Sequence, residues 1–143
     1  MGLFNIFSKK QKRLTTPVDL SIVGCDIHSH FIPGIDDGAK TLEESVQMVS
    51  ELYKLGYKKI ITSPHTMSDY YRNTAESILS GSEKVKEALK EQNIPIEFDA
   101  VSEYYLDYDF ERKLDEEKLL TFGNKHLLFF KVFMPKIISF RMR

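Results

Sequence analysis

Residues 20–30, LSIVGCDIHSH, join an apolar run to two histidines. The run up to Ile27 predicts a buried strand, and turn-forming residues follow it. Side chains alternate across a strand, so His28 and His30 project to the same side and can bind one ion. Neutral imidazoles are good ligands for zinc, manganese or iron. The sequence therefore predicts a metal site at the end of its first strand.

Helical and extended patterns alternate after this strand. We expect a helix that is capped at Thr41 and ends at Gly56, and a second helix from Asn73 or Thr74 to about residue 93. A short charged helix follows, with Leu106, Phe110 and Leu114 as its apolar residues. After the first strand, further strands are expected at 59–63, 95–100 and 127–134. Such alternation predicts an α/β fold of parallel strands joined by helical crossovers, either a doubly wound sheet or the beginning of a barrel.

Further ligand-type residues follow the next two strands. His65 comes directly after the second predicted strand and Glu103 after the third, while Asp36 and Asp37 lie in the loop after His30. An isolated residue of this kind is ordinarily a surface or capping residue, and Asp-Asp-Gly by itself makes a turn. In both architectures, however, chemistry gathers beyond the carboxyl ends of strands. Three successive strands ending in ligand types therefore favour a shared metal site.

The composition is typical of an ordinary globular domain. The chain has 143 residues, of which 42% are hydrophobic and 29% charged, with a formal net charge of -1. This balance gives no attraction to nucleic acid, and no run approaches the roughly 18 apolar residues of a transmembrane helix. All 21 acidic residues lie between residues 14 and 126, which is compatible with a cation site and equally with charged helix surfaces.

The chain divides into three expected regions. These are a flexible basic tail at 1–20, with a short amphipathic membrane anchor as the alternative, a folded domain at 21–128, and an apolar and basic segment at 129–143. Cys25 is the only cysteine, so no intramolecular disulfide is possible and we expect a cytoplasmic protein. We interpret Cys25 as a buried thiol without a nucleophilic role, since no arginine follows it between residues 26 and 37. We assign no role to His126.

Four motifs together resemble a known family. Residues 26–40 (DIHSHFIPGIDDGAK), 61–66 (ITSPHT), 103–107 (EYYLD) and 120–124 (LTFGN) are similar to the bacterial protein-tyrosine phosphatases of the PHP (polymerase and histidinol phosphatase) superfamily, which are associated with capsule and exopolysaccharide synthesis. The resemblance covers about residues 24–128. It implies the N-terminal part of a distorted (β/α)7 PHP barrel with a cluster of divalent metals at its carboxyl end, manganese first, with iron or zinc as alternatives.

The resemblance also implies residue roles. His28 and His30 would hold one metal, Glu103 would bridge two, and Asp37 with His65 would complete the coordination, with Asp36 a weaker candidate. The chemistry would be metal-assisted hydrolysis of phosphotyrosine on a bacterial tyrosine kinase that controls polysaccharide synthesis. Two alternatives stay open. One is a PHP phosphoesterase acting on a small phosphomonoester such as histidinol phosphate, and the other is a non-catalytic remnant.

The sequence departs from the family after the fourth predicted strand. There the family supplies a glutamate and later a histidine, an arginine and an Asp-x-His pair, whereas residues 129–143 contain no Asp, Glu or His. We therefore expect a truncated chain, through an early stop or a reading-frame slip, with impaired activity. The apolar, β-prone residues 127–143 would favour oligomers or aggregates.

Overall fold

The computed structural model describes residues 19–116, 119–123 and 127–132. Its elements, in chain order, are β1 (Cys25–Asp26), α1 (Leu42–Lys54), β2 (Lys59–Thr62), β3 (His65–Thr66), α2 (Ala75–Glu91), β4 (Glu97–Ala100), β5 (Glu103–Tyr105), α3 (Phe110–Glu116) and β6 (Phe129–Lys131). The predicted α/β class is confirmed. Most of the expected tail at 1–20, most of the segment at 129–143, and His126 lie outside the described residues.

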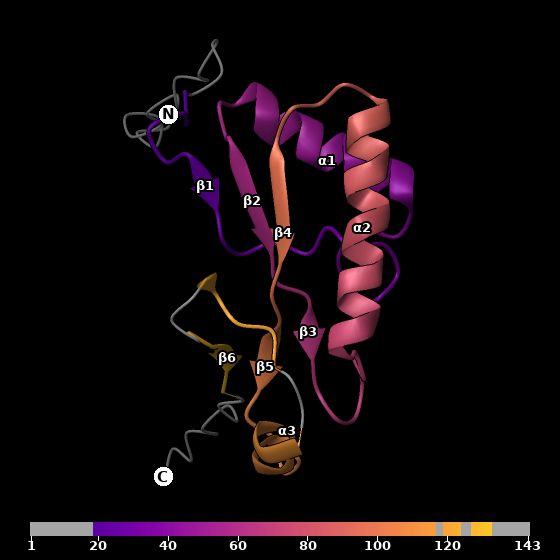
Figure 1. The fold of residues 1–143 in the computed structure, drawn as a ribbon, viewed down its shortest axis with the longest axis vertical. Helices are drawn as coiled ribbons and strands as arrows, with labels where there is room; N and C mark the ends of the chain where they lie inside the picture. Colours follow the sequence, from indigo (N-terminus) through magenta and orange to yellow (C-terminus); the bar gives the residue numbers. More distant parts are fainter. Residues whose placement is uncertain (1–18, 117–118, 124–126, 133–143) are drawn as a thin grey trace, which may run out of the picture.

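The described strands form two small sheets, both with parallel pairing. One has the order β1-β2-β4 and the other β3-β5-β6, and Figure 1 shows the second below the first. The same chain segments run through both sheets, because β3 follows β2 after two residues and β5 follows β4 in the same way. The Val101 amide donates to the Thr62 carbonyl (2.9 Å) and the Glu103 amide to the Pro64 carbonyl (2.9 Å), so strand pairing continues across both breaks.

Helices α1 and α2 pack on one face of the β1-β2-β4 sheet and form the core. Both begin at the predicted cap, since the Thr41 hydroxyl accepts from the Glu44 amide and Thr74 forms a reciprocal capping box with Ser77. The buried core cluster contains Phe31, Val46, Val49, Ile60, Val85, Ala88, Leu89 and Phe98. This packing holds the carboxyl ends of β1 and β2 in place for the loops that follow them.

The predicted strand at 20–27 is mostly wrong. Only Cys25 and Asp26 are extended and paired, while the residues before them form a turn in which the Val23 amide donates to the Leu20 carbonyl (2.9 Å). Gly24 adopts a φ of +71°, a left-handed conformation that interrupts an extended chain. Ile22 is consequently 93% exposed rather than buried. An apolar run alone does not distinguish a strand from a turn that interrupts it.

Gly81, in the middle of α2, permits a close helix contact. A Cβ atom at this position would lie 2.3 Å from Cγ2 of Ile32, whose side chain is 1% exposed. The sequence indicated only that glycine weakens the helix. The structure adds that its missing side chain lets the loop after His30 pack directly against α2.

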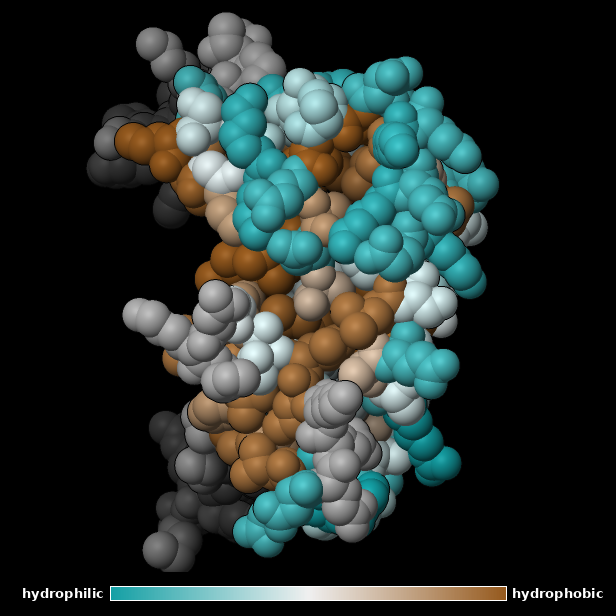
Figure 2. All heavy atoms as spheres, in the orientation of Figure 1, coloured by the Kyte–Doolittle hydropathy of each residue, from teal (hydrophilic) through white to brown (hydrophobic). Residues whose placement is uncertain are grey.

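Apolar surface is exposed beside the two sheets. Figure 2 shows hydrophobic residues across the middle of this view, with hydrophilic residues over α1 and α2. Large exposed hydrophobic side chains include those of Val23, Ile27, Leu127 and Phe130. Within the part of the chain that the structure describes, no helix is both long and apolar enough to span a bilayer.

Candidate metal centre

All five predicted metal ligands lie together. Donor atoms of His28, His30 and Glu103 fall within 4.8 Å of one another, and so do those of His30, Asp37 and His65. His30 belongs to both groups. Two ligands on one zinc-sized ion lie about 3 to 4 Å apart, given bonds of about 2.0–2.2 Å. Both groups therefore have nearly the spacing of a coordination sphere.

The strand register explains why His65 and Glu103 meet. β3 pairs with β5 in parallel, so that His65 stands directly opposite Glu103, and both side chains are buried. Pro64 precedes His65 and offers no amide to the ladder, so β2 ends there and the chain resumes in the second sheet. The predicted position of both residues beyond strand ends is correct, with the addition that each begins a short strand of its own.

The loop between β1 and α1 brings Asp36 and Asp37 back to His30. The Ala39 amide donates to the His30 carbonyl (3.0 Å) and closes the loop. A Cβ atom on Gly38 would lie only 2.1 Å from that same carbonyl oxygen, so no other residue allows this approach without displacing the backbone. The predicted Asp-Gly turn is thus what carries the two carboxylates to the site.

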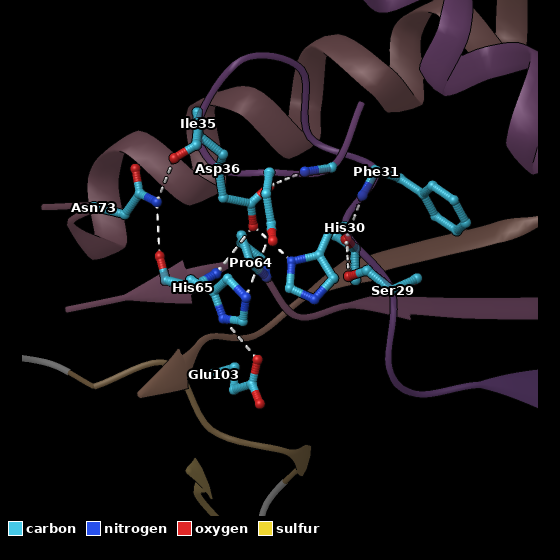
Figure 3. Close-up of polar contacts among 12 residues, drawn as sticks. Ser29, His30, Phe31, Ile35, Asp36, Pro64, His65, Asn73 and Glu103 are labelled. Atoms are coloured by element: carbon cyan, nitrogen blue, oxygen red, sulfur yellow. Dashed lines mark hydrogen bonds and ion pairs between the residues drawn. The ribbon is translucent and has the colours of Figure 1, made fainter. Parts of the chain in front are cut away.

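Asp36 lies outside both donor groups. Its Oδ2 is 2.6 Å from Nδ1 of His30 and also accepts from the His65 amide (3.1 Å), while its Oδ1 accepts from the Gly38 amide (2.9 Å). Figure 3 shows these contacts between the two histidines. Asp37 has a different position, since its side chain is 64% exposed and its Oδ1 lies 3.6 Å from Nε2 of His65.

His65 and Glu103 each carry a buried polar atom without a hydrogen-bond partner among the described residues, which favours a bound ion. Nδ1 of His65 lies 2.7 Å from Oε2 of Glu103, but the two groups are not aligned as a hydrogen bond. Both atoms are buried, and within the described residues neither has a hydrogen-bond partner. Buried polar atoms without partners are costly. The two atoms lie closer together than two ligands of one ion, and His65 and Glu103 belong to different donor groups. Each residue thus offers its own group a donor of a type that suits zinc, manganese or iron.

The surroundings of His30 and His65 shift the pKa values of the two imidazoles in opposite directions. The hydrogen bond to Asp36 raises the pKa of His30, whereas burial lowers the pKa of His65. Burial by itself would raise the pKa of Asp36, but hydrogen bonds from His30, Gly38 and His65 outweigh it and hold that pKa below its usual range. Asp36 is therefore an ionised carboxylate, and His65 is a neutral imidazole of the kind that binds metals.

Residues that the sequence did not single out surround His65. The Tyr71 ring stacks on its imidazole (centroids 5.5 Å apart, planes at 22°), and Tyr105 approaches edge-on at 5.5 Å. Asn73, expected only as a possible helix cap, donates through Nδ2 to the carbonyls of Ile35 (3.0 Å) and His65 (2.7 Å) (Figure 3). An asparagine before a helix start predicts a cap, and nothing in its local sequence signals this bridge.

The surroundings of Cys25 do not favour a thiolate nucleophile. It is half-buried rather than fully buried as expected, and its Sγ lies 3.5 Å from the Asp26 carbonyl oxygen. Burial raises the pKa of the thiol, which keeps it protonated at neutral pH.

Comparisons with known proteins agree with the motifs. Residues 24–137 match the family described as capsular polysaccharide synthesis, CpsB/CapC. Tyrosine-protein phosphatase YwqE of Bacillus subtilis (strain 168) is 27% identical over 104 residues, which are 72% of this chain and 41% of the relative. Tyrosine-protein phosphatase CpsB of Streptococcus pneumoniae is 29% identical over 99 residues, 69% of this chain and 41% of the relative.

A solved structure supports the fold. It is one of the crystal structures of YwqE from Bacillus subtilis and CpsB from Streptococcus pneumoniae, which are described as unique metal-dependent tyrosine phosphatases. This chain aligns with it at a TM-score of 0.69 and 23% identity. The alignment covers 78% of this chain and 47% of that chain, so the chain spans less than half the length of its relatives. The parallel α/β arrangement matches part of their PHP-type fold, which confirms the predicted fold. The chain belongs to the CpsB/CapC family of capsular polysaccharide synthesis.

Proposed function

We propose that this chain forms the N-terminal part of the metal centre of a protein-tyrosine phosphatase. The enzyme would act in the cytoplasm on phosphotyrosine of a bacterial tyrosine kinase that controls polysaccharide synthesis. The observation that carries the proposal is the pair of overlapping donor groups, His28, His30 and Glu103 on one side and His30, Asp37 and His65 on the other. Relatives that are named tyrosine phosphatases support the substrate class.

A divalent ion, manganese first with iron or zinc as alternatives, would supply a water of lowered pKa and offset negative charge on the phosphate. The protein's own contribution is to hold the donors in place. Strand pairing holds the backbone of His65 opposite that of Glu103, and the closed loop brings Asp37 near His65. Because Nδ1 of His30 is engaged by Asp36, only Nε2 of His30 is left to serve an ion.

The 143-residue chain itself would be a poor catalyst. Residues 129–143 contain no Asp, Glu or His, so this segment adds no ligand of the types found in the two donor groups. We propose that the chain binds metal through the described residues and hydrolyses phosphate esters slowly.

A chimera tests the function. Residues 24–128 of this chain would replace the matching segment of the B. subtilis relative, and hydrolysis of a phosphotyrosine peptide would be compared with hydrolysis of histidinol phosphate. We expect peptide hydrolysis that is abolished by chelator, restored by Mn²⁺, lost in His30→Ala and retained in Cys25→Ser. Chelator-resistant hydrolysis that is lost in Cys25→Ser would contradict the proposal. Preference for histidinol phosphate would favour the small-substrate alternative.

A further inference from the structure

Asp36 occupies a buried position between the two donor groups. Its carboxylate has no exposed surface, and it contacts the His30 side chain and the His65 backbone at the same time. We propose that Asp36 is a positioning residue of the metal centre, which fixes the His30 proton on Nδ1 and thereby presents Nε2 to the ion. This inference rests on the proposed function, since it concerns the same centre.

The chemistry of the contact determines where the proton lies. Oδ2 of Asp36 already accepts a hydrogen bond from the His65 amide, so it also acts as the acceptor in the 2.6 Å contact, and the proton lies on Nδ1 of His30. A neutral imidazole with a proton on Nδ1 has its lone pair on Nε2. Metal-binding histidines are commonly oriented by such a carboxylate on the other ring nitrogen. Asp36 thus selects both the tautomer and the ring orientation of His30.

Asp36 also joins three segments of the site. Besides His30 it accepts from the amides of Gly38 and His65, which belong to the loop and to β3 respectively. His30 is the residue shared by both donor groups. One carboxylate therefore sets the position of the shared ligand and of the backbone of a second ligand.

Asparagine at this position cannot reproduce all three bonds. Its NH₂ group would replace one carboxylate oxygen and would face N–H donors in either orientation, either Gly38 alone or His65 together with the His30 proton. We expect Asp36→Asn to weaken Mn²⁺ binding about 10- to 100-fold, the range typical for loss of an outer hydrogen-bond partner.

The tautomer itself provides the first test and needs no variant. Two-dimensional ¹⁵N NMR of the metal-free chain, at alkaline pH where the imidazoles are neutral, distinguishes a proton on Nδ1 from one on Nε2. We expect His30 to carry it on Nδ1 in the wild type and predominantly on Nε2 in Asp36→Ala. A wild-type His30 protonated on Nε2 would overturn the inference.

Calorimetric titration with Mn²⁺ provides the second test. Asp107→Asn is the matched control, because Asp107 also accepts two backbone amides, from Ser68 (2.8 Å) and Asp109 (3.1 Å), and among the described residues none of its hydrogen bonds involves the five donors. We expect weaker Mn²⁺ binding in Asp36→Asn and wild-type binding in Asp107→Asn. Equal Mn²⁺ affinity in wild type and Asp36→Asn would refute the positioning role. A chain with the Nδ1 proton that binds no Mn²⁺ would instead refute the proposed function.

Discussion

Gly81→Ala should destabilise the fold, although alanine is the better helix former. Replacing a helical glycine by alanine contributes about 0.5–1 kcal/mol of helix stability. The new Cβ, however, would lie 2.3 Å from Cγ2 of Ile32, which is buried and close to its own backbone, so it cannot move away easily. Overpacking of this kind typically costs about 1–3 kcal/mol. We expect a net loss of about 1–2 kcal/mol in the free energy of unfolding.

Urea unfolding followed by far-UV circular dichroism measures this loss. Ser80→Ala, an exposed neighbour on the same helix, is the control and should change stability by less than about 0.5 kcal/mol. Leucine at position 32 has no Cγ2 methyl, so Ile32→Leu should recover part of the loss in the double variant, with a coupling energy of about 1 kcal/mol. A Gly81→Ala chain more stable than wild type would refute the close contact between α2 and the loop after His30.

Three further predictions concern the cap, a carboxylate and the thiol. Thr41→Ala removes the bond from the Glu44 amide (3.2 Å) and should cost about 1 kcal/mol in urea unfolding, whereas Thr41→Ser should cost much less. Burial alone would raise the pKa of Asp107, but hydrogen bonds from Ser68 outweigh it and hold that pKa below its usual range. Asp107 therefore stabilises the fold above its unfolded pKa, about 3.9, and this stability is lost as pH falls through the folded pKa. Unfolding at a series of pH values should show a smaller acid loss in Asp107→Asn, and an unchanged loss would contradict the assignment. Cys25→Ser should leave Mn²⁺ affinity unchanged in calorimetry, and a clear decrease would make the thiol part of the site.

Local signals in the sequence predicted the helices well. The arrangement of the strands was predicted less well, because it depends on long-range contacts. Thr41 and Thr74 mark helix starts through their own hydroxyls, so both helices could be placed from neighbouring residues alone. The second sheet depends on pairings such as that of His65 with Glu103, between residues far apart in the chain. The apolar run before Cys25 failed as a strand because a turn interrupts it.

The site shows the same distinction. The candidate donor residues and their places after strands were readable from sequence, because His, Asp and Glu are side chains that can bind metals and parallel strands end at one edge. The difference between Asp36 and Asp37 was not readable. These adjacent identical residues differ in burial, since the Asp36 carboxylate is buried against the His30 ring and the Asp37 side chain is largely exposed near His65.

We expect the five donors to form one metal centre with His30 in common, and calorimetric titration of the 143-residue chain with Mn²⁺ measures this. His30→Ala should lose more affinity than Glu103→Gln or Asp37→Asn, because His30 belongs to both groups and each of the others to one. His126→Ala is the control histidine and should bind as the wild type does. Wild-type Mn²⁺ affinity in His30→Ala would show that His30 is not the ligand shared by the two groups.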